Sequence, residues 1–351
     1  MKSPTPPIEW ADDHIRIIDQ TLLPGKVKII EVRTAAAAVD AINRLAIRGA
    51  PALGAFGALA LIVGLDEQAP STFGDATGRL EELRTFIGDA RPTAVNLRWA
   101  VDRVIDNAVS STETLDDLRS ALLVEAHKVA EEDAAACTEI GRLGHELLRT
   151  AITIGTHCNA GRLATAGTGT ALAPMYAKAE AGEPLRVLAS ETRPLLQGAR
   201  LTAWELDDAG IDVTVLPDAA MASTVLSGEV DAYIVGADRI AANGDTANKI
   251  GTVAHALAAR EAGIPFYVAA PTSTIDPSLP NGTHIEIEER DGNEVHEIQG
   301  QRVTPEGVNA ANPAFDVTPE NLITAIITEV GVLRAPFRTS IADALLRAGA
   351  S

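Results

Sequence analysis

The chain has 351 residues, of which 46% are hydrophobic, and that length exceeds one ordinary core, so we expect two compact domains. Its 48 acidic and 29 basic residues give a formal net charge of −19. Because nucleic acids and anionic membranes are polyanions, neither is expected as a partner. The sequence has no apolar run long enough to span a membrane and no secretory signal, so we expect a cytoplasmic protein.

Lysine is scarce: only 6 of the 29 basic residues are lysines. Acidity with few lysines suits a high-salt cytoplasm, in which charge repulsion is screened. A GC-rich genome explains the arginine bias equally well. The two interpretations differ in one measurement, because a melting temperature unchanged between low and molar salt would refute salt adaptation.

Helical patterns dominate residues 1–149, the predicted first domain. Two short apolar runs, Ile15–Ile18 and Val27–Val32, are separated by Leu-Pro-Gly and predict a small β-hairpin. Helices are then expected from Thr34, which is a good N-cap, to Ile47, from Ser71 or Thr72 to Ile87, and after Thr112 or Thr114. This half is therefore predicted to be mostly helical.

Residues 150–351, the predicted second domain, alternate strand, loop and helix. The apolar runs lie at 152–154, 187–189, 213–216, 232–235 and 266–269. Such alternation predicts right-handed crossovers, a parallel sheet and an α/β fold. Ligands bind at the carboxyl ends of strands in such sheets. This rule selects five loops, at 157–159, 191–193, 217–218, 236–239 and 271–274.

The two cysteines, Cys137 and Cys158, form no disulfide framework and no metal-binding pattern. Cys137 lies in an alanine-rich run and is predicted to be a small buried side chain on a helix. Cys158 follows a predicted strand, and glycines after it let the backbone approach a ligand closely, with a helix expected from Thr170. We therefore expect its thiol to face a cleft; the alternative is an inert core residue.

Motifs for nucleotide hydrolysis, zinc proteolysis, ester hydrolysis and dinucleotide binding are absent, and nothing demands a cofactor. Asp238 follows a predicted strand, where a half-buried carboxyl can donate a proton. Its alternative role is a helix cap or an ion pair with Arg239. Arg48, Gly49 and Ala50 open a helix and make a possible phosphate cradle; a simple salt bridge is the other interpretation.

Three further stretches carry polar groups toward possible ligands. Arg91 repeats the arginine corner before a predicted helix at 94–105. Asn248 and Lys249 follow a turn and precede a helix predicted from Ile250, so Lys249 is expected to point at a ligand near that helix end. Gln197 is less informative, because such a residue is usually a solvent-facing helix position.

Taken together, these stretches resemble the methylthioribose-1-phosphate isomerase family, which is related to ribose-1,5-bisphosphate isomerases and to regulatory subunits of the translation-initiation exchange factor. The motifs that carry the resemblance are RGAPALG from Arg48, RPTAVNLRWA from Arg91, THCNAGRLATAGTGTAL from Thr156, ETRPLLQGARLTAWEL from Glu191, GADRIAANGDTANKIGT from Gly236 and NPAFDVTPENLITAIITE from Asn312. They span most of the chain.

The resemblance implies a helical N-terminal domain, a Rossmann-like C-terminal domain and a homodimer that needs no metal or nucleotide cofactor. It implies that Cys158 and Asp238 are catalytic and that a small sugar phosphate is the substrate. The positions implied to bind that substrate are Arg48, Gly49, Ala50, Arg91, Gln197, Asn248 and Lys249.

Two departures from the family pattern flank the cysteine loop, at Arg162 and Thr168. They leave the substrate's distal group open. Methylthioribose 1-phosphate is the expected substrate, with 5-deoxyribose 1-phosphate and ribose 1,5-bisphosphate as alternatives. A non-catalytic regulatory protein is a further alternative, although such a protein would not need Cys158 and Asp238.

Overall fold

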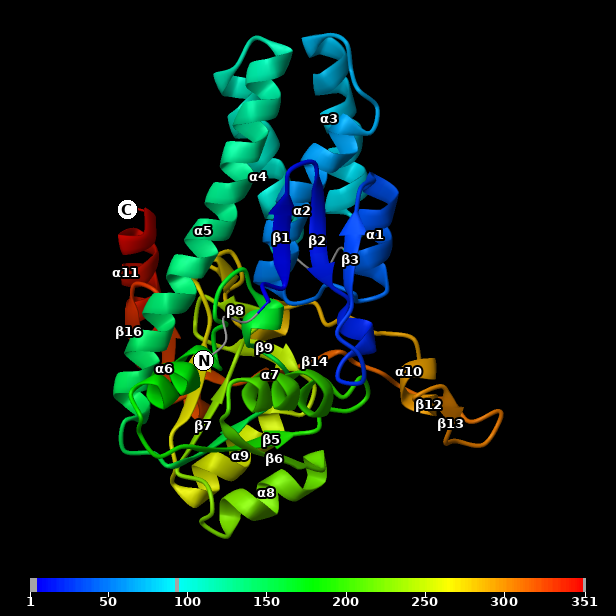
Figure 1. The fold of residues 1–351 in the computed structure, drawn as a ribbon. Coiled ribbons are helices and arrows are strands. Elements are labelled where there is room, and N and C mark those ends of the chain that lie inside the picture. The colour runs from blue at the N-terminus through cyan, green and yellow to red at the C-terminus, as the bar shows by residue number, and fades with distance from the viewer. Residues whose placement is uncertain (1–4, 92–94, 350–351) are drawn as a thin grey trace. The chain divides into compact units, whose positions relative to one another are not determined.

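The computed structural model describes residues 5–91 and 95–349 (Figure 1). The chain divides into two compact units, one made of residues 1–138 and 161–169 and the other of residues 139–160 and 170–351. The second unit thus begins before the break at 149/150 that the sequence suggests, and a short segment after Cys158 belongs to the first unit. The division into domains at 149/150 stays a prediction.

A three-stranded antiparallel sheet begins the first unit, in the order β1 (Ile8–Ala11), β2 (His14–Ile18) and β3 (Ile29–Val32). The predicted hairpin is the β2–β3 pair, and β1 extends it. Ile15 and Ile17 are buried and alternate with the half-buried His14 and Arg16, as one apolar face of a strand requires.

Among the described residues, the first unit also contains the α-helices α1 (Ala35–Asn43), α2 (Ala50–Asp66), α3 (Phe73–Gly88), α4 (Val95–Ser111) and α5 (Leu115–Leu148), the last of which continues into the second unit. The Thr34 and Thr72 side chains accept hydrogen bonds from Ala37 N and Asp75 N. Both predicted N-caps are therefore confirmed. Helix α1 stops earlier than predicted, before Ile47.

Helix α2 forms the core of this unit, because it is buried from Ala52 to Leu65. Glycines allow neighbouring helices close: a Cβ at Gly57 would lie 2.3 Å from Leu97 of α4, and one at Gly64 would lie 2.7 Å from Leu83 of α3. An all-round apolar helix needs such enclosure. Within the described residues, no helix combines the length and apolar character needed to cross a membrane.

The second unit is built on a seven-stranded sheet in the order β16-β15-β10-β7-β4-β5-β6. All neighbours pair in parallel except β15 and β16. The five predicted apolar runs are all strands of this sheet. The strands are β4 (Thr153–Thr156), β5 (Arg186–Ser190), β6 (Asp212–Leu216), β7 (Ala232–Val235), β10 (Phe266–Ala269), β15 (Ala325–Thr328) and β16 (Gly331–Leu333).

Alternate residues of the central strands enter two different cores. Tyr233 and Val235 of β7 pack in one core with α8 (Asp218–Leu226), α9 (Thr252–Ala262) and α11 (Phe337–Gly349). Ala232 and Ile234 pack in the other, with the end of α5, α6 (Ala173–Glu180) and α7 (Ala203–Asp208). The sheet is therefore covered on both faces, which explains why its strands read as continuous apolar runs.

The strand order reverses between β4 and β7. The chain runs outward from β4 to β5 and β6, then returns to the other side of β4 with β7 and β10. At such a switch point the loops leaving two adjacent parallel strands diverge and leave a crevice where ligands bind. Cys158 follows β4 and Asp238 follows β7, so both predicted catalytic residues flank this point.

The second unit also contains a smaller, four-stranded sheet, whose first strand follows β7 in the chain. Its strand order is β11 (Ile275–Asp276), β8 (Arg239–Ala241), β9 (Thr246–Lys249) and β14 (Phe315–Thr318). The helix predicted from Ile250 begins later, as α9 at Thr252, because Lys249 ends β9 and Gly251 takes a left-handed φ of 102°. The helix predicted from Thr170 likewise begins later, at Ala173. A short helix α10 (Asn293–His296) and the hairpin β12 (Glu297–Ile298)–β13 (Gln301–Arg302) complete the fold.

Candidate active site

Cys158 occupies the loop that leaves β4, in a backbone conformation that side chains rarely adopt. Its φ is 64°, which costs about 1–2 kcal/mol for a residue with a Cβ. The surrounding structure holds this conformation from both sides: the Cys158 amide donates to Thr192 Oγ1 at 2.9 Å, and the Thr202 hydroxyl donates to Cys158 O at 2.6 Å. The loop that carries the half-exposed thiol is therefore held in a strained conformation by several hydrogen bonds. Strain of this kind is found mostly at functional positions.

Thr192 is itself fixed by the next loop along the sheet. It has a φ of 67°, and the amides of Thr192 and Arg193 each donate to a different oxygen of Asp218 at 2.7 Å. Asp218 begins α8 directly after β6. Three consecutive strand ends thus support the cysteine, through β6 to Asp218, β5 to Thr192 and β4 to Cys158.

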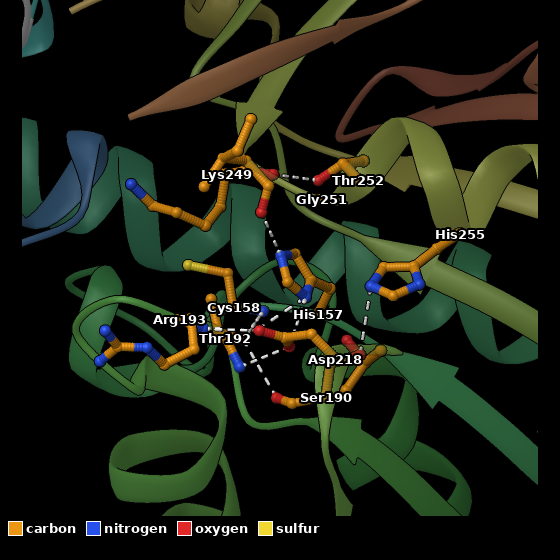
Figure 2. Close-up of polar contacts among 12 residues, drawn as sticks. His157, Cys158, Ser190, Thr192, Arg193, Asp218, Lys249, Gly251, Thr252 and His255 are labelled. Carbon is orange, nitrogen blue, oxygen red and sulfur yellow. Dashed lines mark hydrogen bonds and ion pairs between the residues drawn. The ribbon is translucent and has the colours of Figure 1, made fainter. Parts of the chain in front are cut away.

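His157, beside the cysteine, joins this group to the other side of the switch point. Its Nε2 lies 2.9 Å from Ile250 O, and because a carbonyl only accepts, Nε2 carries the hydrogen. The other ring nitrogen, Nδ1, lies 3.4 Å from Thr192 Oγ1. Figure 2 shows the ring between the Lys249–Thr252 segment and Thr192. The bond to Ile250 therefore links the neighbours of Cys158 and Lys249.

The hairpin after β7 brings Asp238 to Asn248. The Asp238 amide donates to Ala247 O at 2.9 Å, and Arg239 pairs with Ala247 in the β8–β9 register. Asp238 is half-buried, whereas Asn248 and Lys249 are buried. Lys249 Nζ donates to Ala314 O at 2.8 Å and lies 4.5 Å from the Phe315 ring centroid. Cys158 and Asp238 thus lie in loops that flank the switch point, and Asn248 and Lys249 end strand β9 beside Asp238.

Gln197 departs from the solvent-facing role suggested by the sequence, because only 6% of it is exposed. Its Oε1 has no hydrogen-bond partner within the described parts of the chain. The next residue, Gly198, starts a π-helical turn, and a Cβ there would lie 1.7 Å from Ser190 O. Glycine is therefore required where this turn returns to the end of β5, and Gln197 is buried as a result.

The remaining predicted residues belong to the first unit. Gly49 caps α2 with a φ of 95°, and a Cβ there would lie 2.5 Å from Ala164 O, so only glycine fits. Arg48 and Ala50 flank it and are half-buried, as is Arg91; the residues that follow Arg91, 92–94, lie outside the described part. The role of this group, Arg48, Gly49, Ala50 and Arg91, at the site stays a prediction.

Two buried imidazoles near Cys158 stay neutral at ordinary pH. The rings of His157 and His255 lie 4.8 Å apart edge to face, and His255 Nε2 lies 3.2 Å from Ser190 Oγ. Burial lowers the pKa of both, that of His255 to about 3. Asp316 accepts from Gly251 N at 2.8 Å, and burial raises its pKa to about 6.

Sequence reasoning selected the loops that contain His157, Thr192 and Asp218 but assigned these residues no role. Their position at strand ends was the only available signal, because their partners lie far away in the chain. Among the described residues, no cluster of three or more His, Cys, Asp or Glu side chains is arranged to hold a metal ion.

Comparison with known proteins relates the whole chain to one family. The profile of the initiation factor 2 subunit family matches residues 46–335. A 5-deoxyribose 1-phosphate isomerase of Moorella thermoacetica is 50% identical, covering 98% of this chain and 99% of its own length. A methylthioribose-1-phosphate isomerase of Geobacter metallireducens is 49% identical, covering 95% and 97%.

Solved structures agree with the sequence relatives. The 5-methylthioribose 1-phosphate isomerase of Pyrococcus horikoshii superposes with a TM-score of 0.92 at 40% identity, covering 99% of this chain and 97% of its own. A translation initiation factor eIF-2B delta subunit of A. fulgidus gives 0.89 at 40% identity, covering 98% and 100%. The chain belongs to the initiation factor 2 subunit family, which among these relatives includes sugar-phosphate isomerases.

Proposed function

We propose that the chain is an aldose–ketose isomerase that converts 5-methylthioribose 1-phosphate into 5-methylthioribulose 1-phosphate, a reaction of methionine salvage. The observation that carries the proposal is the placement of Cys158 and Asp238 after β4 and β7, on either side of the switch point. The full-length similarity to isomerases of this name supports it. The isomerase acts as a cytoplasmic homodimer with a helical N-terminal and a Rossmann-like C-terminal domain.

The chemistry begins with opening of the furanose ring, because the phosphate on the anomeric oxygen prevents spontaneous opening. Protonated Asp238 donates its proton to the ring oxygen as the bond between that oxygen and C1 breaks. Hydrogen then moves from C2 to C1, and the C2 hydroxyl becomes the ketone as its proton passes to the Asp238 carboxylate, which restores the protonated acid. Cys158 assists this transfer beside C2. The product is an isomer of the substrate, so no oxidant or reductant is consumed.

Binding energy from the phosphate is used for orientation. Arg48, Arg91 and the amides of Gly49 and Ala50 hold the phosphate, while Gln197, Asn248 and Lys249 hold the sugar. Such anchors align C1 and C2 with the acid and the thiol. Loss of an anchor should raise KM, whereas loss of Cys158 or Asp238 should lower kcat.

The route of the hydrogen distinguishes two versions of this mechanism. A proton route passes through an enol phosphate, so a deuterium label at C2 exchanges with water during turnover. A hydride route carries the label directly to C1. Product isolated from C2-deuterated substrate and examined by NMR decides between them.

A second substrate is favoured by one observation, the 50% identity to the 5-deoxyribose 1-phosphate isomerase. The two substrates differ only in the small apolar group at C5. The test is one assay that offers methylthioribose 1-phosphate, 5-deoxyribose 1-phosphate and ribose 1,5-bisphosphate, with kcat/KM compared. We expect the first to be preferred. Preference for another reassigns the substrate, and turnover of none would favour a regulatory binding protein.

A further inference from the structure

We propose that His157 is a positioning residue that sets the distance between the Cys158 loop and the Lys249–Gly251 turn. The inference rests on the proposed function only in its kinetic part. The feature concerned is the His157 bridge, defined here as the side chain of His157 with its contacts to Ile250 O and Thr192 Oγ1. It crosses from β4 to the segment after β9.

The bridge is short, buried and directional. Only 1% of His157 is exposed, and its Nε2–H has the Ile250 carbonyl as acceptor at 2.9 Å. Gly251 leaves room for the ring, because a Cβ there would lie 3.3 Å from Nε2. A side chain at residue 251 would therefore crowd the imidazole. The Nε2 edge of the ring is thus held by the hydrogen bond to Ile250 O and by the close approach of Gly251, and the Nδ1 edge faces Thr192 Oγ1.

The His157 bridge links Cys158 to Lys249, because each is the direct chain neighbour of a residue in the bridge. Cys158 follows His157 directly, and Lys249 precedes Ile250 directly. Displacement of the imidazole would let the thiol and the lysine move independently. Reacting groups lose rate steeply when they are misplaced by about 1 Å, up to about a hundredfold. Control of this separation is therefore a determinant of turnover that none of the proposed substrate-binding residues supplies.

Burial keeps the His157 imidazole neutral, and the charges near the ring act in opposite directions. Burial lowers the pKa of His157, and nearby Lys249 lowers it further. Asp218 is the opposing group, with Oδ1 4.0 Å from Nδ1, but its two oxygens already accept from Thr192 N and Arg193 N. The neighbouring His255 ring is also neutral. A neutral imidazole whose Nε2–H already donates to Ile250 O holds the two segments at a set distance.

The experiment compares His157→Gln, His157→Asn and the matched control His255→Gln. The glutamine amide nitrogen lies the same number of bonds from Cα as Nε2, so it can still donate to Ile250 O; asparagine is too short. His255 is equally buried and contacts Ser190 rather than Ile250. Its replacement therefore reports the cost of losing a buried imidazole without losing the bridge.

We expect His157→Asn to lower kcat on methylthioribose 1-phosphate about tenfold or more, with KM changed less than about threefold. His157→Gln and His255→Gln should keep kcat within about threefold of the parent enzyme. The pH profile of kcat/KM for His157→Gln should have the same shape as that of the parent. A shifted limb would overturn the inference, because it would make His157 an acid or base.

Hydrogen exchange supplies a readout that needs no activity. His157→Asn should speed exchange in both 156–160 and 248–252, whereas His255→Gln should leave 248–252 unchanged. Equal effects of the two variants, or a folded His157→Gln as inactive as Cys158→Ser, would overturn the inference. If His157→Asn does not fold, His157→Gln decides between these results. Absence of turnover by the parent enzyme would refute the proposed function. The hydrogen-exchange comparison would still test the His157 bridge, because it does not depend on activity.

Discussion

The two cysteines of this chain occupy opposite kinds of environment. Cys137 lies on α5 and is only 1% exposed. Gly167 packs so closely against it that a Cβ at residue 167 would lie 2.9 Å from the Cβ of Cys137. Burial raises the pKa of its thiol to about 12. Cys158 lies half-exposed on a left-handed loop at the switch point of a parallel sheet. The Cys137 thiol is therefore part of a core, whereas the Cys158 thiol is accessible at the end of a strand.

The contrast shows that the reactivity of a cysteine depends on where the fold places it and not on residue type alone. A buried thiol with a raised pKa is protonated at neutral pH and unreactive, because the thiolate is the nucleophile. A glycine would adopt the left-handed backbone at residue 158 at lower cost. The backbone hydrogen bonds of Cys158 to Thr192 and Thr202 nevertheless hold this residue at the carboxyl edge of the sheet, where ligands bind in folds of this type.

The largest test of this contrast is catalytic. Cys158→Ser and Asp238→Asn should each lower kcat by about a hundredfold or more, because each removes acid–base help at the reacting carbons. Cys137→Ala should change kcat less than about twofold. Steady-state assays with methylthioribose 1-phosphate measure all three. Normal turnover by Cys158→Ser would remove the thiol from the mechanism.

The second test uses pH, because the Cys158 region contains buried imidazoles. The folded chain holds His255 neutral, with its pKa lowered to about 3, whereas the unfolded chain protonates it below about pH 6.5. This stability is therefore present above pH 6.5 and lost as pH falls toward 3. For His255 the loss amounts to about 2 kcal/mol between pH 7 and pH 5.

Urea unfolding at pH 7 and pH 5 measures this loss in the parent and in His255→Gln. The parent should lose about 2 kcal/mol more than the variant. The comparison must be differential because Asp316, with its pKa raised to about 6, acts in the opposite sense and stabilises the folded chain as pH falls through that value. Equal losses would show that His255 takes up no more protons on unfolding than glutamine does.

A third test measures the thiols directly. In the native chain, iodoacetamide should label Cys158 at least about tenfold faster than Cys137, because Cys158 is half-exposed and burial raises the pKa of the Cys137 thiol. Peptide mass spectrometry after timed quenching gives both rates. Unfolding in urea is the control and should bring the two rates together. Similar rates in the native chain would contradict the contrast between the two sites.

The smallest effect concerns stability at the buried thiol. Cys137→Ala leaves a small cavity against the 165–169 segment and should lower the free energy of unfolding by about 1–2 kcal/mol. The same substitution at Cys158, Cys158→Ala, should cost less than about 0.5 kcal/mol, because the half-exposed thiol leaves no cavity. Chemical unfolding of both variants measures the difference. A larger loss at Cys158 would assign its sulfur to packing.

Several elements could be predicted from local sequence because their causes are local. Thr34 and Thr72 cap helices through hydrogen bonds to residues three positions ahead. The apolar runs of β4, β5, β6, β7 and β10 report burial on both faces of the sheet. The stretch Arg48 to Ala50 predicted a helix start, and α2 begins at Ala50. Where the deciding partner is a few residues away, composition and spacing are sufficient.

The failures occurred where a distant partner decides the local conformation. Residues 246–249 form a strand rather than the approach to a helix because β8 and β14 pair with them. His157 received no role, since its acceptor, the Ile250 carbonyl, lies 93 positions away in the chain.

By itself, the sequence determined the helical first half, the parallel α/β second half and the loops in which chemistry is expected. Those properties follow from side-chain periodicity and capping, which act over one or two turns of chain. Only the tertiary structure decided which loops meet, because the strand order places β7 beside β4 and reverses direction there. That order depends on free energies summed over two cores, and no short stretch of sequence contains them.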